Sequence, residues 1–332
     1  MSDRLIHSRG RREPLPIRDG LNPTRARVPE GHAPVSARDF LHTLISTQRH
    51  RHPADDAEAL RARFDDGEVV LRDGTPLHPD SLIPAGQDVW FYRMPAPETP
   101  VPYEIRVIEE DDALLVVDKP PFLATMPRAR HITETATVRL RRATGNNDLV
   151  PAHRLDRQTS GVLVFTKRRE VRGAYQRLFA ERKVDKVYEA IADHDATLAD
   201  AAPVRWASRM HKVHGEIQGS VVDGEANAFT VLDDVTALSE TEQAKIEAVH
   251  GPRPRQARYR LRPETGRTHQ LRLHMWAAGV PILGDGIYPV IHPAEDEDLG
   301  VPLHLISREL AFVDPLSGVR RTFTALRRQA WG

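Results

Sequence analysis

The sequence contains no cysteine, which excludes disulfides, thiolate zinc sites, iron–sulfur clusters and thiol nucleophiles. It also contains no run of about 18 apolar residues, so a membrane-spanning helix is excluded. The first residues lack the apolar core of a signal peptide. Together these absences predict a soluble protein of the cytoplasm.

Several sequence motifs of cofactor and metal enzymes are absent as well. Neither GxGxxG nor GxxxxGK[ST] occurs, so no dinucleotide fold and no phosphate-binding P-loop is indicated. HExxH and GxSxG are also missing, and none of the sixteen histidines lies in a metal-binding pattern. What remains is an enzyme without a metal or a nucleotide cofactor, or a protein that is not an enzyme.

The 332 residues suffice for one large domain with a smaller appendage. Residues 1–34 combine seven arginines and five prolines without apolar periodicity, which predicts a disordered basic arm. A frayed terminus without a role is the alternative. Residues 96–102 read as a proline-rich linker between domains, and residues 328–332 as a short tail.

Residues 35–95 have the pattern of a small α/β module. Ala57, Leu60 and Phe64 share a helical face, residues 68–72 predict a strand, and residues 89–92 predict the returning strand. This order resembles the second half of a small RNA-binding domain that is named after a ribosomal protein. Two interpretations stay open, a degenerate RNA-binding domain and a structural appendage.

Residues 103–327 predict the large domain. The pattern indicates strands at 113–118, 162–165, 187–192 and 256–262, helices at 170–182 and 268–278, and a final hairpin of 304–312 with 321–325. For the second helix, Thr268 is the expected N-cap and Gly279 the expected stop. Because βαβ alternation is absent, we expect an α+β fold with a mixed, largely antiparallel sheet flanked by helices.

Charge is unevenly distributed along this domain, although the net charge of the chain is zero. Residues 119–189 contain sixteen Lys and Arg against seven Asp and Glu, whereas residues 190–249 contain four against eleven. The basic stretch predicts a face that binds a polyanion. A solvated helix face is the alternative. The acidic segment, 193–255 overall, shows no clear periodicity.

One cluster indicates chemistry, the string HRLDRQTSG at residues 153–161. It places Asp156 between Arg154 and Arg157, just before an apolar strand. Neighbouring cations favour the ionised carboxylate, which suits a nucleophile or an electrostatic stabiliser rather than a general acid. The alternative is a structural ion pair that braces a turn.

This string resembles the signature of RNA pseudouridine synthases of the RluA type. Four further segments resemble motifs of that family in the expected order. They are LLVVDKPPFLATMP at 114–127, KVYEAIA at 186–192, ETGRTHQLRLHMWAAGVPILGDGIYP at 264–289 and PLHLISRELAFVDPLSG at 302–318. The resemblance covers about residues 103–327.

The resemblance implies an isomerase that converts uridines of structured rRNA or tRNA to pseudouridine, without a cofactor, after flipping the base into a pocket. It implies Asp156 as the nucleophile, Tyr188 as a stacking and proton-transfer residue, and Arg272 as the partner of Asp156. The residues expected to contact substrate RNA are Arg154, Arg157, Lys119, Arg267, His269 and Leu273. We expect a monomer.

Two other functions compete with this interpretation. One is a catalytically idle RNA-binding protein on the same fold. The presence of Asp156, Tyr188 and Arg272 together argues against it. The other is a glycosidase-like carboxylate enzyme, which would need a second positioned carboxylate that the motifs do not supply.

Overall fold

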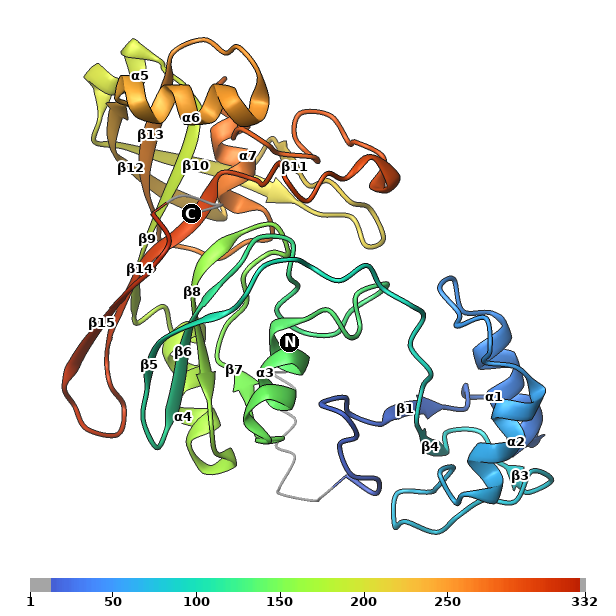
Figure 1. Cartoon of the computed structure of the whole chain (residues 1–332). Helices are drawn as coiled ribbons and strands as arrows, with labels where there is room; N and C mark the ends of the chain where they lie inside the picture. The colour runs from blue at the N-terminus through green and yellow to red at the C-terminus, as the bar shows by residue number, and fades with distance from the viewer. Residues whose placement is uncertain (1–12, 329–332) are drawn as a thin grey trace. The chain divides into compact units, whose positions relative to one another are not determined.

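The computed structural model describes residues 13–328, and Figure 1 shows the order of the elements along the chain. The chain divides into two compact units. The first holds the residues up to Thr99 together with 127–133 and 138–147, and the second holds 100–126, 134–137 and the chain from Asp148 onward. The division falls within the predicted linker. It also assigns two segments of the predicted large domain to the first unit.

The first unit is a small α/β body built around its own hydrophobic core. Its elements before residue 100 are β1 (Thr24–Arg27), β2 (Val35–Ser36), α1 (Ala37–Ser46), α2 (Ala57–Asp65), β3 (Leu82–Ile83) and β4 (Asp88–Phe91). Strand β1 pairs with β4, and β2 pairs with β3. Phe40, Leu41, Leu60 and Phe64 from the two helices pack against Phe91. Whether this unit binds RNA stays a prediction.

Two predictions for this part of the chain are wrong. Residues 13–34 are not disordered, because β1 pairs with β4 and because side chains of α3 (Ala136–Thr144) hold residues 19–22. There Arg141 donates to the Gly20 carbonyl over 3.1 Å and to Asn22 over 3.0 Å. Residues 1–12 of the predicted arm lie outside the described residues. Residues 68–72 do not form a strand, since Val70 alone makes isolated bridges there.

Within residues 13–328, the second unit contains one sheet of eleven strands. Nine follow the order β11-β10-β12-β13-β9-β14-β8-β6-β5, while β15 pairs with β14 and β7 with β8. Their bounds are β5 (Arg106–Glu110), β6 (Leu114–Lys119), β7 (Val150–Pro151), β8 (Ser160–Thr166), β9 (Val184–Asp193), β10 (Val204–His211), β11 (Ser220–Val222), β12 (Ala228–Ala237), β13 (Gln256–Pro263), β14 (Leu305–Val313) and β15 (Arg320–Thr324). Among these pairs only β8 with β14 is parallel. The predicted mixed, largely antiparallel sheet is confirmed.

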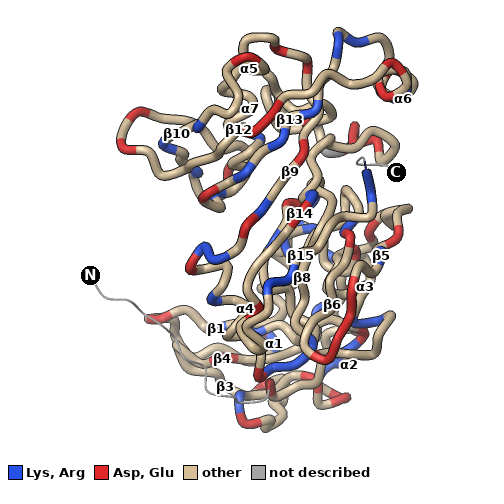
Figure 2. Tube along the Cα trace, turned by 90° about the vertical axis from the view of Figure 1, so that its left-hand side faces the viewer, with Lys and Arg blue, Asp and Glu red and all other residues tan. Residues whose placement is uncertain are grey.

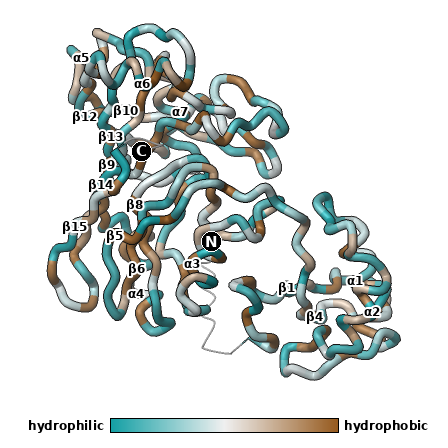
Figure 3. The backbone as a smooth tube through the Cα atoms, in the orientation of Figure 1, coloured by the Kyte–Doolittle hydropathy of each residue, from teal (hydrophilic) through white to brown (hydrophobic). Residues whose placement is uncertain are grey.

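Two helices bury their apolar faces against different parts of this sheet. On α4 (Arg169–Ala180), Val171, Tyr175 and Leu178 recur at helical spacing and join the core of β6, β8 and β14. On α7 (Gln270–Ala277), Leu271 and Met275 join the core of β9, β12 and β13. Figure 3 shows hydrophobic residues along β6 and β8, which contribute to the first of these cores. The two cores therefore fix α4 and α7 on the sheet.

The acidic segment 193–255 is regularly folded, although its sequence showed no clear periodicity. It contains β10, β11 and β12 with the helices α5 (Ala196–Ala201) and α6 (Glu240–His250). Acidic residues of this segment are visible on α6 in Figure 2. Less exposed and exposed positions alternate along β10, but only Met210 is buried there, and all three residues of β11 are exposed. Because these two strands bury so few side chains, the hydrophobic pattern of the sequence did not reveal them. A short 3-10 helix, η1 (Ala294–Asp296), lies in the loop before β14.

Candidate active site

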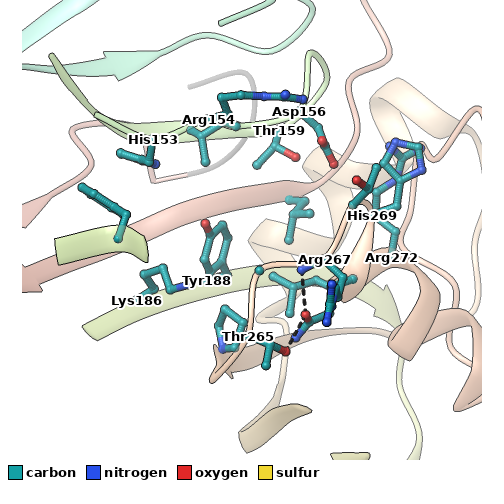
Figure 4. A pocket seen from close by; sticks show the side chains of 18 of the residues that line it. His153, Arg154, Asp156, Thr159, Lys186, Tyr188, Thr265, Arg267, His269 and Arg272 are labelled. Carbon is teal, nitrogen blue, oxygen red and sulfur yellow. Dashed lines mark hydrogen bonds between the residues drawn. The ribbon is translucent and has the colours of Figure 1, made fainter. Parts of the chain in front are cut away.

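A cavity of about 600 Å³ lies in the second unit where several loops meet the sheet. Its walls come from the 151–159 loop, strand β9, the 263–269 loop and the start of α7, with Gln176 and Phe179 of α4 at one side. Figure 4 shows the carboxylate of Asp156 turned toward His269 and Arg272, while Tyr188 rises from β9 toward the same space. The motifs at 153–161, 186–192 and 264–289, far apart in the sequence, thus contribute to one cavity.

The loop that carries Asp156 is held by buried polar groups on both sides. On one side, the hydroxyl of Thr125 donates to the Leu155 carbonyl over 2.8 Å and accepts from the Leu155 amide over 3.1 Å. On the other side, the buried Nζ of Lys119 donates to the Arg157 carbonyl over 3.1 Å. The amide of Thr159 donates back to the Asp156 carbonyl over 3.1 Å, which closes the turn. The position of Asp156 is therefore set by the fold around it.

Gly161 lets this loop enter the sheet. It has a φ of +105°, and a Cβ atom there would lie 2.3 Å from the Ser307 carbonyl oxygen, far inside contact distance. This close approach starts the parallel pairing of β8 with β14. On the other side of β14, Ser307 pairs with Tyr188 of β9. The glycine of the motif therefore brings the Asp156 loop and Tyr188 to the same part of the sheet.

Strand β9 contributes Tyr188 and Lys186, which share one face at the two-residue period of a strand. Burial raises the pKa of Tyr188 to about 12, and the charge of Asp156 adds to the rise. The phenol is therefore protonated at neutral pH and available as a hydrogen-bond donor. Burial lowers the pKa of Lys186, and the charge of Arg182 lowers it further. Lys186 was not among the predicted site residues, although it is two residues from Tyr188.

Arg272 lies at the cavity wall, but its partner differs from the prediction. Its Nε donates to Asp285 Oδ2 over 2.7 Å and its Nη2 to Asp285 Oδ1 over 2.5 Å. The predicted ion pair between Arg272 and Asp156 is wrong as a direct contact. Burial lowers the pKa of Arg272, but the bonds to Asp285 and the charges of Asp285 and Asp156 raise it overall. Asp156 is therefore close enough to act on Arg272 electrostatically without being its bonded partner.

The start of α7 differs from the prediction too. The N-cap is His269, not Thr268, and it has the left-handed φ of 57° without a side-chain cap. Its Nδ1 lies 2.9 Å from the hydroxyl of Tyr288. Burial lowers the pKa of His269, so the ring is neutral near pH 7. The expected stop is confirmed, because Gly279 follows the C-cap with a φ of +83°.

Six of the nine predicted site residues line the cavity: Asp156, Tyr188, Arg272, Arg154, Arg267 and His269. The other three do not. Lys119 is fully buried and bonded to backbone carbonyls, and Leu273 is 1% exposed in a core with Met210, so contact with RNA is wrong for both. Arg157 donates to the Phe122 carbonyl over 3.0 Å and pairs with Glu297, so it braces the loop. Whether Arg157 also contacts RNA stays a prediction.

His153, the first residue of the motif, was not selected as a site residue but lines the cavity wall. Its ring stacks on Phe179 with centroids 4.4 Å apart, and its Nε2 accepts the Val164 amide over 3.2 Å. Burial lowers its pKa to about 3. A neutral ring bonded in this way supports the loop and is unsuited to acid–base catalysis at neutral pH.

Buried neutral histidines predict that acid destabilises the fold. Burial lowers the pKa of His274 to about 4 and that of His153 to about 3, whereas unfolded histidines titrate near 6.5. Between these values the unfolded chain binds more protons, so stability falls as the pH decreases from about 6.5. The replacement His274→Gln should reduce the slope of unfolding free energy between pH 6 and 5 by about 1.4 kcal/mol per pH unit. Urea unfolding at several pH values measures it.

The control for this prediction is His78→Gln, because the side chain of His78 is 75% exposed. It should leave the slope unchanged. A His274→Gln protein with the wild-type slope would contradict the assignment of a neutral His274 in the folded state.

Within residues 13–328, no group of three or more His, Asp or Glu side chains is arranged to hold a metal ion. None of the helices in that part of the chain has the length and hydrophobicity needed to cross a bilayer.

Comparison with known proteins places this site in a family. The family described as RNA pseudouridylate synthase matches residues 113–277, which include Asp156, Tyr188 and Arg272. The dual-specificity RNA pseudouridine synthase RluA of Haemophilus influenzae is 34% identical over 226 residues, which cover 68% of this chain and 93% of that protein. The tRNA pseudouridine synthase C of Vibrio parahaemolyticus is 28% identical and covers 69% of this chain and 93% of its own length.

A solved structure agrees with these relatives. Human RNA Pseudouridylate Synthase Domain Containing 1 superimposes with a TM-score of 0.52 at 22% identity, covering 66% of this chain and 82% of that chain. This similarity shows a common fold. The family match and the RluA relative show that the chain belongs to the RluA-type family of RNA pseudouridine synthases.

Proposed function

We propose that this cavity converts specific uridines of structured RNA, in rRNA or tRNA, to pseudouridine with Asp156 as the nucleophile and without a cofactor. The observation that carries the proposal is the convergence of Asp156, Tyr188 and Arg272 on one cavity. Asp156 is also the only carboxylate among the described residues that line it. One charged nucleophile therefore faces the bound base.

The chemistry of the reaction is consistent with such a site. Pseudouridine is an isomer of uridine, so the reaction adds and removes no atoms or electrons overall. The bond from uracil N1 to ribose C1′ breaks, the base turns, and C5 bonds to C1′. The proton leaves C5, and N1 carries one in the product. These steps need a nucleophile and proton transfer, and no oxidant or reductant enters the balance.

Tyr188 and Arg272 support this role of Asp156. The Tyr188 ring offers an aromatic face on which a flipped uracil can stack. Its hydroxyl, with a pKa of about 12, stays protonated at neutral pH and donates a hydrogen bond. Arg272 keeps its positive charge at the wall and offsets the negative charge that accumulates on the departing base.

The surroundings fit a flipped nucleotide. A cavity of about 600 Å³ is in the range of small-ligand sites, and a base of a stem can reach it only by leaving the stack. Arg154 is exposed at the rim, so we assign it to the position in the RNA that the base vacates. Arg267, also exposed, and Lys186 are suited to phosphate contacts.

The two alternatives from the sequence have less support. An idle RNA-binding protein does not explain why Asp156, Tyr188 and Arg272 converge in one cavity of a pseudouridine synthase. A glycosidase-like enzyme needs two carboxylates about 5 to 9.5 Å apart, and the described lining residues supply only Asp156.

The proposal is tested with bulk RNA from a strain that lacks the gene, so that the target uridine is unmodified. Purified protein is added in buffer with EDTA and no cofactor, and pseudouridine is mapped by mass spectrometry after carbodiimide labelling. We expect conversion at one or a few sites in rRNA or tRNA. Loss of conversion in EDTA that added metal restores would overturn the cofactor-free mechanism, and conversion confined to another RNA class would overturn the substrate assignment.

A further inference from the structure

Asp285 is a buried carboxylate behind the cavity, and the mechanism above gives it no role. Its side chain is 1% exposed and that of its partner Arg272 is 2% exposed. Both carboxylate oxygens accept from the guanidinium, over 2.7 and 2.5 Å. Two parallel charge-assisted bonds fix the plane of the guanidinium as well as its position. Asp285 itself does not line the cavity.

The same carboxylate also fixes the turn that follows it. Its Oδ1 accepts the amides of Ile287 over 2.8 Å and of Tyr288 over 3.0 Å. The preceding Gly284 has a φ of +76°, and a Cβ there would lie 2.2 Å from the Pro302 carbonyl oxygen. Only glycine permits this close approach of the chain to Pro302 directly before Asp285.

This turn reaches a second residue of the cavity wall. The Tyr288 hydroxyl lies 2.9 Å from His269 Nδ1 and accepts the Gly219 amide over 2.7 Å. Tyr288 is 1% exposed, so its ring has little freedom to move. Asp285 therefore determines, through separate contacts, where Arg272 and His269 stand at the wall that faces Asp156.

We infer that Asp285 is a positioning residue for the isomerisation: it holds Arg272, and through Tyr288 also His269, in place opposite Asp156. This inference rests on the proposed function of the cavity. A carboxylate that only stabilised the fold would not need to orient a guanidinium at the cavity wall. The inference therefore predicts a loss of rate at unchanged RNA affinity, which a purely structural role does not.

The test uses Asp285→Asn in the full-length protein. Asparagine keeps the oxygen that caps the turn but replaces Oδ2 by an NH₂ group, which faces the Nε donor of Arg272 and carries no charge. We expect the single-turnover rate on RNA from the deletion strain to fall about 100-fold, as for a displaced catalytic group, while the RNA dissociation constant stays unchanged. The matched control is Asp296→Asn in the exposed part of the same loop, which should have the wild-type rate.

A double-mutant cycle with Arg272→Lys shows whether Asp285 acts through Arg272. If it does, the double variant should be no slower than the slower single variant, whereas independent roles would multiply. Multiplied losses, or a wild-type rate for Asp285→Asn, would overturn the inference. An inactive wild-type protein would instead overturn the proposed function, so the two failures are distinguishable.

If thermal unfolding shows that the asparagine variant does not fold, Asp285→Glu is tested in its place. It keeps the negative charge but moves the carboxylate by one methylene. We expect it to fold and to have a rate between those of Asp285→Asn and the wild type. A folded glutamate variant with the wild-type rate would show that the position of the carboxylate is unimportant and would overturn the inference.

Discussion

Asp156→Asn should abolish isomerisation while leaving the fold and RNA binding intact. Asparagine has nearly the same shape but is a poor nucleophile and carries no charge. The loop around position 156 is held by backbone and side-chain bonds of its neighbours, including those of Thr125 and Lys119, so it should keep its conformation. Loss of a nucleophile that acts as a unit with its neighbours typically costs a factor on the order of 10⁶. Pseudouridine formation on RNA from the deletion strain measures it.

The control is Asp185→Asn on β9, whose carboxylate is 70% exposed and pairs with the exposed Arg320. A surface pair of this kind contributes about 0 to 1 kcal/mol to stability, so this variant should be fully active. RNA affinity from filter binding should be equal for both variants and the wild type. Wild-type turnover in Asp156→Asn would refute the nucleophilic role.

The sequence predicted the elements that bury a continuous apolar surface. Strands β6 and β8 are buried at every position, and their apolar runs are visible without knowledge of the fold. Helix α4 shows its buried face at the three- and four-residue spacing. Strand β10 was missed because one of its less exposed positions is the polar Ser208 and only Met210 is buried, and β11 because all three of its residues are exposed. Strand β1 was missed because its pairing with β4 involves residues about 60 positions apart, which local patterns do not contain.

The sequence predicted site residues only where they lie in family motifs. The family motifs located Asp156, Tyr188 and Arg272, which line the same cavity. They did not identify bonded partners, because these depend on how distant segments meet. Lys119 illustrates this limit. From the sequence, a lysine beside prolines was expected to contact RNA, but in the structure its Nζ donates to three backbone carbonyls. Asp285 illustrates it too. Only the turn between α7 and β14 brings its carboxylate to Arg272.

Arg272→Ala should lose both activity and stability, because Arg272 lines the cavity and also forms a buried ion pair with Asp285. Removal of one partner of a buried pair leaves the other charge uncompensated and typically costs about 3 to 5 kcal/mol. The side chains of Arg272 and Asp285 are 2% and 1% exposed, so the pair is of this kind. Arg272→Lys keeps one positive charge but cannot occupy both oxygens of Asp285. It should stay folded yet lose most of its turnover, because an ammonium cannot take the place of the planar guanidinium opposite Asp156.

Urea unfolding and single-turnover rates on one RNA separate these effects. The control is Arg205→Ala, which removes a similar fork from Glu264 at the surface, where the side chains are 51% and 44% exposed. This variant should lose about 0 to 1 kcal/mol and keep its rate. A loss of stability in Arg272→Ala with an unchanged rate in Arg272→Lys would make the pair purely structural. An alanine variant with unchanged stability and rate would remove Arg272 from the site altogether. We expect a stable lysine variant with little turnover. This result would show that the reaction needs the planar guanidinium of Arg272, whereas the fold needs only its positive charge.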